Sequence, residues 1–122
     1  MPVLTPIDHG SPAYEQTVAL RRSVLRLPLG LDFSPDELAA ERRDWHLTVW
    51  SDDGAALRGC LVLSPLGNGV AKMRQVAVAD AWRGHGLGRM LVGYAEQFAR
   101  ERGIRELVLN AREAVVPFYE PL

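Results

Sequence analysis

The amino-acid sequence predicts an α/β fold: a mixed sheet in which an antiparallel meander precedes a parallel β-α-β unit, with helices on both faces. Three observations lead to this prediction. Between residues 45 and 78, apolar and polar residues alternate between short turn sequences, as in hairpin-connected strands. Residues 86–102 have the three- and four-residue apolar spacing of a helix. The apolar run 107–109 follows that helix, and a helix crossover makes it parallel to the strand at 70–78.

Size and composition indicate one soluble domain over residues 1–122. A chain of 122 residues with 48% hydrophobic and 24% charged residues is ordinary for such a domain. Its net charge of −1 gives no reason to expect nucleic acid or an anionic membrane as a partner. Cys60 is the single cysteine, which favours a cytoplasmic location. No histidine has metal-like spacing to another histidine or to Cys60, so we expect no metal.

The first half of the chain is read from its caps and prolines. Residues 2–7 contain two prolines and suit an edge strand. Ser11-Pro12 predicts a helix that ends near Pro28, and Ser34 with Glu37 predicts a capping box for a short helix to about residue 43. Within the first helix, Arg21 and Arg22 are predicted to form a solvated face.

The meander and the last helices follow from period and turn signals. Strands are predicted at 45–50, 57–63 and 70–78, with a turn from Pro65 to Gly69. The 86–102 helix should end before Gly103. Residues 114–120 should open a final helix. The apolar stripe of the 86–102 helix consists of Leu87, Met90, Leu91, Tyr94, Ala95 and Phe98.

A glycine-rich turn joins the 70–78 strand to this helix. A helix N-terminus offers free backbone N–H groups and a positive dipole end, which together bind anions such as a pyrophosphate. Gly84, Gly86 and Gly88 remove side chains that would hold phosphate oxygens away, and Arg83 and Arg89 add cationic donors. The residues predict a ligand that bears phosphate groups.

Two other phosphate-binding motifs are excluded by spacing. The dinucleotide fingerprint G-x-G-x-x-G would need glycine at position 89 or 91, which are Arg89 and Leu91. The P-loop motif needs Gly-Lys-Ser/Thr, a tripeptide that the chain lacks.

The remaining pattern, R-x-x-G-x-G at Arg83, Gly86 and Gly88, resembles the GNAT superfamily of acyl-CoA-dependent N-acetyltransferases. The resemblance covers roughly the last fifty residues, where the strand, turn, helix, second strand and Phe118-Tyr119 fall in the family's order. More typical members place an asparagine where this chain has Arg112. The resemblance implies acetyl-CoA as co-substrate and a small-molecule or peptide amine as acceptor.

The resemblance also implies roles for individual residues. The backbone of Val76, Ala77 and Val78 would pair with the pantetheine arm, with Asn110 nearby. Tyr119 would be the general acid that protonates the leaving thiolate. The pyrophosphate would be held by the turn, which consists of Arg83, Gly84, His85, Gly86, Leu87, Gly88 and Arg89.

The general base and the class of function stay open at this stage. The general base is not identified, because Arg74 and Gln75 stand where many relatives have a glutamate; Glu113 is an alternative, as is a water held by Gln75. A non-catalytic acyl-CoA-binding module and a phosphate-binding protein of another class are alternative functions.

Family members continue after the tyrosine into two more strands, whereas this sequence stops at Leu122. We therefore expect a sheet without those strands, whose 107–109 edge recruits a second copy of the chain as a homodimer.

Overall fold

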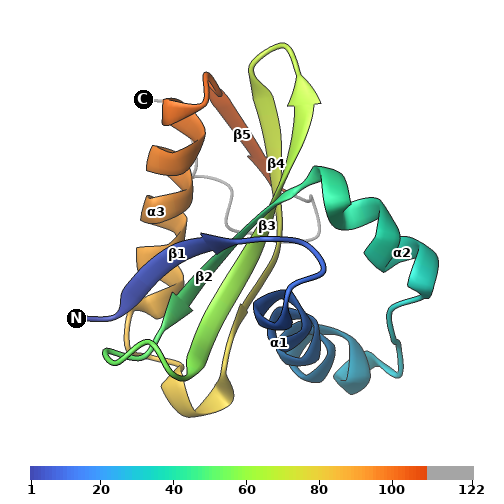
Figure 1. The fold of residues 1–122 in the computed structure, drawn as a ribbon, viewed down its shortest axis with the longest axis vertical. Coiled ribbons are helices and arrows are strands. Elements are labelled where there is room, and N and C mark those ends of the chain that lie inside the picture. Colours follow the sequence, from blue (N-terminus) through green and yellow to red (C-terminus); the bar gives the residue numbers. More distant parts are fainter. Residues whose placement is uncertain (110–122) are drawn as a thin grey trace.

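The computed structural model describes residues 1–109, and within them one mixed sheet forms the centre of the molecule (Figure 1). Its strands are β1 (Val3–Ile7), β2 (Trp45–Trp50), β3 (Leu57–Gly67), β4 (Val70–Val78) and β5 (Glu106–Leu109), in that spatial order. Neighbouring strands from β1 to β4 are antiparallel, whereas β4 and β5 are parallel. This arrangement confirms the predicted meander followed by a β-α-β unit.

Helices cover both faces of the sheet (Figure 1). On one side lies α3 (Leu87–Glu101), which joins β4 to β5 through the short turn η4 (Asp80–Trp82). The other side carries α1 (Pro12–Arg21), the turns η1 (Arg22–Arg26) and η2 (Leu27–Leu29), α2 (Pro35–Ala40) and η3 (Glu41–Arg43). None of the helices within residues 1–109 has the length and apolar character needed to cross a bilayer.

The predicted caps are both present. The Ser11 side chain accepts a hydrogen bond from the Tyr14 amide at 3.1 Å and begins α1. Ser34 and Glu37 form the reciprocal capping box of α2, with both bonds at 3.1 Å. These local bonds satisfy amides that the first helical turn leaves without acceptors.

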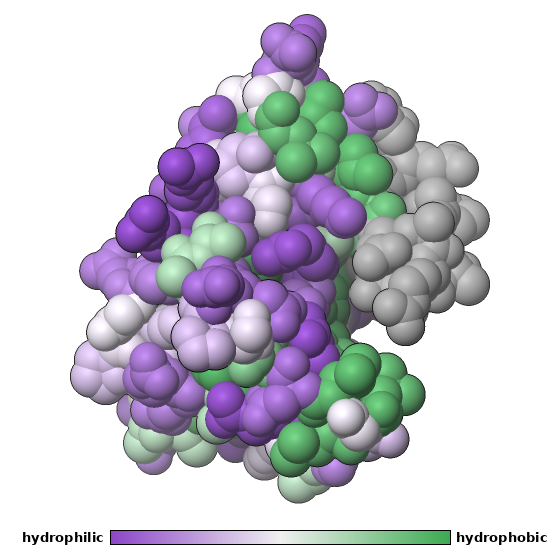
Figure 2. All heavy atoms as spheres, turned by 90° about the vertical axis from the view of Figure 1, so that its right-hand side faces the viewer, coloured by the Kyte–Doolittle hydropathy of each residue, from purple (hydrophilic) through white to green (hydrophobic). Residues whose placement is uncertain are grey.

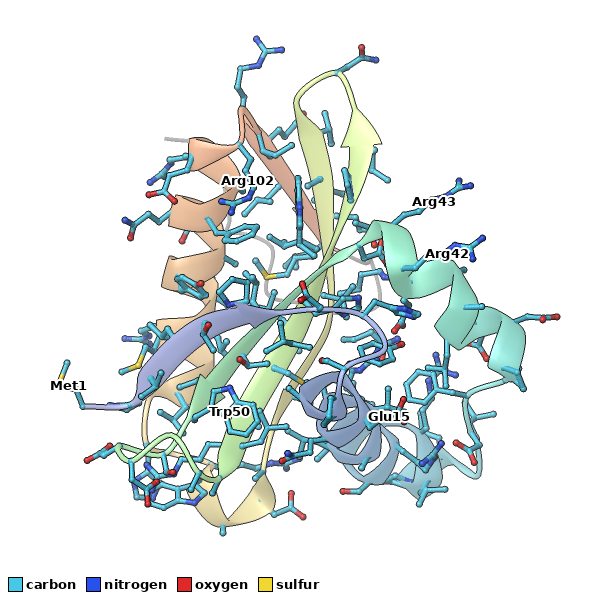
Figure 3. All side chains as sticks on the ribbon, viewed as in Figure 1. Met1, Glu15, Arg42, Arg43, Trp50 and Arg102 are labelled. Carbon is cyan, nitrogen blue, oxygen red and sulfur yellow. The ribbon has the colours of Figure 1, made fainter. Side chains whose placement is uncertain are left out.

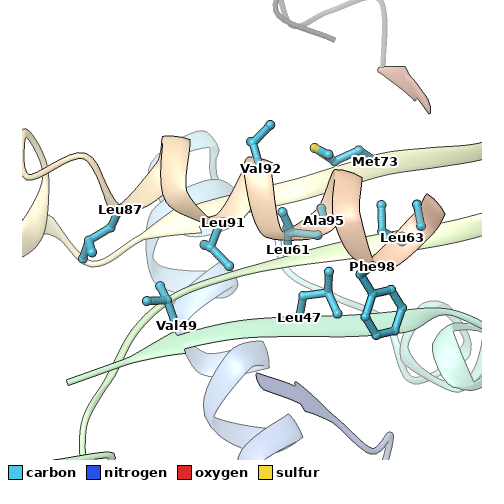
Figure 4. Close-up of a cluster of buried hydrophobic side chains, with 11 residues drawn as sticks. Leu47, Val49, Leu61, Leu63, Met73, Leu87, Leu91, Val92, Ala95 and Phe98 are labelled. Carbon is cyan, nitrogen blue, oxygen red and sulfur yellow. The ribbon is translucent and has the colours of Figure 1, made fainter. Parts of the chain in front are cut away.

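The main core lies between α3 and the sheet (Figure 4). Leu91 and Ala95 of α3 are fully buried against strand residues such as Leu47 and Leu61. Burial of each such large aliphatic side chain favours folding by roughly 1.5–3 kcal/mol relative to exposure. The predicted stripe of α3 is therefore confirmed as core, with Met90 and Tyr94 partly buried at its margin.

β3 is longer than the sequence predicted. It continues through Pro65 to Gly67, and Pro65 lies opposite Ala71 of β4. The pairing of β3 with β2 starts at Leu63, opposite Trp45, so Pro65 has only β4 beside it. A proline costs no ladder bond on a side where no strand pairs. The chain reverses at Gly67, Asn68 and Gly69, which all have positive φ.

The prediction for Arg21 is wrong. Its side chain is fully buried on the inner side of α1, near the second apolar cluster of Tyr14, Val18 and Phe33. The guanidinium makes a bidentate pair with Glu41 of η3, with N–O distances of 2.8 Å. Arg22, in contrast, is partly exposed and pairs with Asp32 at the surface.

Candidate functional site

The glycine-rich turn takes a backbone shape that requires glycine. Gly84 and Gly86 have φ of +81° and +78°, in the left-handed region that side chains disfavour. Gly86 is the N-cap residue of α3 and offers no side chain to bind the helix amides. The N–H groups of Leu87 and Gly88 have no carbonyl within the helix to bind, because they belong to its first turn. The turn therefore presents backbone donors at the positive end of α3.

These donors face an open concavity of about 490 Å³. A Cβ atom added at Gly84 or Gly86 would meet no atom within 4 Å, and one at Gly88 would meet only the Val78 side chain at 3.8 Å. Side chains at these positions would enter the concavity instead of the protein interior. The concavity is lined by Val78, Trp82, Arg83, Gly84, Gly86, Leu87, Gly88 and Arg89. These residues fit a phosphate-bearing ligand held by main-chain amides.

Cationic and aromatic side chains border the concavity. Arg83 is largely exposed and pairs with Asp80 at 3.2 Å. The Arg58 guanidinium lies 3.5 Å from the ring centroid of Trp82, which holds the indole at the rim. His85 does not line the concavity; it is exposed, and its ring centroid is 5.1 Å from that of Trp82.

Next to this turn, the β5 side of β4 has no strand partner among residues 1–109. Its pairing with β5 ends at Met73 opposite Leu109, so within residues 1–109 no strand pairs with that side of residues 74–78. The register with β3 also shifts here, and Gln75 has φ of +58°. This is a β-bulge, which redirects the backbone groups that follow it. The predicted backbone site Val76–Val78 thus follows the bulge on β4 and pairs with β3 on its other side.

The face of β4 that points away from α3 contacts a buried charged cluster, which the sequence analysis did not predict. Arg21 and the Tyr14 hydroxyl, which donates at 2.7 Å, hold the Glu41 carboxylate. Arg74 of β4 reaches this cluster through Nη2, which lies 3.4 Å from Asp44 Oδ2 and 3.8 Å from Glu41 Oε2.

The environment determines the protonation states in this cluster. Burial alone would raise the pKa of Glu41, but its bonds and charge interaction with Arg21 outweigh burial and hold the pKa below the usual range. Burial raises the pKa of the Tyr14 phenol, and the Glu41 carboxylate raises it further. Burial lowers the pKa of His46, whose Nε2 lies 2.9 Å from the Glu41 carbonyl oxygen. Glu41 is therefore a structural anion and is poorly suited to remove a proton from an amine.

Two predicted site residues, Asn110 and Tyr119, lie outside the described residues, as does Glu113. Within residues 1–109 no group of three His, Cys, Asp or Glu side chains has the arrangement of a metal site.

Comparisons with known proteins agree with this geometry. A relative from Trypanosoma brucei brucei, described as a glucosamine 6-phosphate N-acetyltransferase, is 34% identical over 56 residues, which is 46% of this chain and 38% of the relative. The IAA acetyltransferase of Bacillus cereus superposes with a TM-score of 0.69 at 21% identity, over 89% of this chain and 65% of that one. A GNAT family acetyltransferase of Elizabethkingia anophelis, solved with acetyl-CoA bound, superposes at 0.68 with 18% identity, over 88% and 63%.

The chain thus spans less than two thirds of the length of each of these relatives. At these identities the two superpositions establish the fold alone. The sequence family is established separately, because the profile of the "Acetyltransferase (GNAT) family" matches residues 17–122, most of the chain. This profile, together with a strand, a glycine-rich turn and a helix in the order that the motif predicted, shows that the chain belongs to the GNAT acetyltransferase family.

Proposed function

We propose that this protein transfers the acetyl group of acetyl-CoA to a primary amine by direct attack in a ternary complex. The observation that supports this most is the adjacency of two features: the N-terminus of α3 with its three glycines, and the bulged segment 74–78 of β4, which has no partner on its β5 side among residues 1–109. The first suits a pyrophosphate, and the second suits an amide-bearing arm that bonds to a strand backbone.

Different residues are proposed to bind different parts of acetyl-CoA. In the proposal, the turn from Arg83 to Arg89 holds the pyrophosphate, and the backbone of Val76–Val78 bonds the pantetheine amides. An N–H group of this segment stabilises the negative charge that develops on the thioester oxygen. The neutral amine nitrogen attacks the carbonyl carbon, and the carbon–sulfur bond breaks. The thiolate that leaves takes a proton, and the new amide nitrogen gives one up to solvent.

Tyr119 is proposed as the donor of that proton, with Asn110 near the pantetheine. Both assignments rest on the family motif. A phenol has an ordinary pKa near ~10 and can protonate a thiolate in a general-acid step. No residue is proposed as the general base. Glu41 is unsuited to this role, because its carboxylate accepts hydrogen bonds from Arg21 and Tyr14.

The ligand preference of the chain tests the proposed pyrophosphate site at residues 83–89. CoA and acetyl-CoA should raise the melting temperature of the chain, whereas NADH and ATP should not, because the turn lacks both competing fingerprints. Stabilisation by NADH or ATP but not by CoA would refute the proposal.

A matched pair of variants tests where the phosphates bind. Gly88→Ala and Gly93→Ala both place a methyl group on α3, and Gly93→Ala, in the helix interior, should stabilise it by about 1 kcal/mol. A Cβ atom added at Gly93 would meet no atom within 4 Å, and Gly93 does not line the concavity. Gly88 does line the concavity. Only Gly88→Ala should weaken CoA binding, by roughly tenfold or more, since it obstructs a bond to a charged group. Equal CoA affinity in the two variants would place the phosphates elsewhere.

Turnover distinguishes an enzyme from a binding module. Release of thiol from acetyl-CoA in the presence of an amine supports catalysis, whereas tight CoA binding without turnover of any amine supports the non-catalytic alternative. The acceptor panel should include glucosamine 6-phosphate, because the Trypanosoma relative is described as its acetyltransferase. Association of two copies through the 107–109 edge and a cytoplasmic location stay predictions, to be checked by light scattering and by cell fractionation.

A further inference from the structure

We propose that the acceptor amine carries an anionic group, a carboxylate or a phosphate, and that Arg74 binds this group. This inference rests on the proposed function and concerns its substrate class. If β4 holds the thioester at residues 76–78, the acceptor can approach from the face of β4 opposite α3. That face carries Arg74, since its neighbour Met73 points into the α3 core and side chains alternate along a strand.

The Arg74 guanidinium has unused bonding capacity. Its described contacts all involve Nη2, at 3.4 Å from Asp44 and 3.8 Å from Glu41, both longer than a typical hydrogen bond of 2.7–3.2 Å. Its Nε, like Oε1 of the adjacent Gln75, is buried without a hydrogen-bond partner among residues 1–109. A guanidinium has five N–H donors and binds planar anions through two of them. Arg74 is therefore suited to a further anion.

The surrounding charges leave Arg74 as the group that an anion can reach. Glu41 is fully engaged by Arg21 and Tyr14, and its side chain is only 3% exposed. The Arg74 side chain is 35% exposed, so solvent and ligands reach it without opening the core. Asp44 competes through one long contact, and Lys72 lies on the same face, two residues earlier on β4. The face of the molecule in Figure 2 carries hydrophilic residues at its centre and left and hydrophobic patches at its top and lower right.

Position relates the anion to the reacting nitrogen. Arg74 precedes Val76 by two residues, so the backbone separates them by at most about 7 Å, the value for an extended strand. The bulge at Gln75 lies between them. An acceptor bound by Arg74 would bring its amine to the thioester if amine and anion are a few bonds apart. α-Amino acids have amine and anion close together, whereas amino sugar phosphates hold the two farther apart, so the two classes test different separations.

The test uses pairs of acceptors that differ in the anion alone: an amino acid with its carboxamide, and glucosamine 6-phosphate with glucosamine. In at least one pair the anionic member should have the larger kcat/KM, by about 10- to 100-fold, the range expected for a charged hydrogen bond. The pair that shows the difference identifies a carboxylate or a phosphate. Arg74→Gln should reduce this ratio to near one, while Arg74→Lys, which keeps the charge, should retain part of it.

Controls separate this inference from folding and from the proposed function. Arg43→Gln removes the same charge from an exposed side chain at the end of η3 (Figure 3) and should leave the ratio unchanged. Thermal unfolding and acetyl-CoA affinity should be similar in the Arg74 variants and the parent chain. An unchanged ratio in Arg74→Gln, or turnover only of neutral amines, overturns the inference alone. Failure of the parent chain to bind acetyl-CoA, or binding without turnover of any amine, would instead overturn the proposed function.

Discussion

Replacement of Arg21 by methionine should strongly destabilise the fold. The Arg21 side chain is fully buried and the Glu41 side chain is 3% exposed, with two N–O contacts of 2.8 Å between them. Methionine fills much of the same space but leaves the Glu41 carboxylate buried with the Tyr14 hydroxyl as its remaining close donor. Breaking a buried ion pair in this way typically costs about 3–5 kcal/mol.

That loss is large against the stability of a domain, which is typically about 5–15 kcal/mol. For a chain of this size each kcal/mol lowers the melting temperature by roughly 4 °C, so a decrease of roughly 12 °C or more is expected. Thermal unfolding at pH 7, followed by circular dichroism, measures it directly.

Arg22→Met is the matched control. Arg22 is the next residue and also pairs with a carboxylate, at 2.6 Å from Asp32, but the two side chains are 37% and 55% exposed. Exposed pairs contribute little, so the melting temperature should hardly change. The double variant Arg21→Met/Glu41→Leu should recover part of the loss, because it removes the unpaired charge. Equal losses for Arg21→Met and Arg22→Met, or no recovery in the double variant, would refute the reasoning.

Three further predictions concern pH dependence, thiol reactivity and the proposed general acid. The melting temperature should fall as the pH drops below 6.5, because burial depresses the pKa of His46 and the unfolded chain takes up the proton first. A second fall should begin below 4.5, because the pKa of Glu41 is depressed in the folded chain and the unfolded chain is protonated first. A constant melting temperature between pH 7 and 4 would contradict this. Cys60 is 2% exposed and burial raises its pKa to about 12, so a thiol reagent should react with it only in denaturant. Tyr119→Phe should lower kcat by roughly 10²–10⁴-fold with CoA affinity nearly intact if Tyr119 is the general acid; equal losses of stability and affinity would indicate packing instead.

Local signals explain why most of the fold could be predicted. Each cap, at Ser11 and Ser34, uses residues within three positions of each other. The α3 stripe and the strand alternation reflect the burial of one side of each element, which leaves a period in the sequence. The parallel placement of β5 follows from the crossover rule.

The sequence indicates the burial of Arg21 but not its pairing with Glu41. Tyr14, Thr17, Val18 and Arg21 are three or four residues apart and share the buried face of α1, so the spacing alone could have placed Arg21 inward. Its partner lies 20 residues away, and no local rule connects the two. The bulge at Gln75 had no signal, since a glutamine with positive φ is held there by tertiary context.

The buried Glu41 carboxylate connects the elements on the acceptor side of the sheet. It belongs to η3, accepts bonds from Tyr14 and Arg21 of α1, and lies 3.8 Å from Arg74 of β4. The proposed phosphate site is lined by the end of β4, η4, the turn at residues 83–86 and the first turn of α3, and includes no residue of α1 or η3. Loss of Arg21 should therefore disturb the position of Arg74 more than it disturbs the phosphate site. In Arg21→Met, assayed at a temperature where it is folded, KM for the acceptor should rise while affinity for acetyl-CoA stays close to that of the parent chain. A parallel loss of both would mean that the cluster supports the whole domain and has no separate influence on the acceptor face.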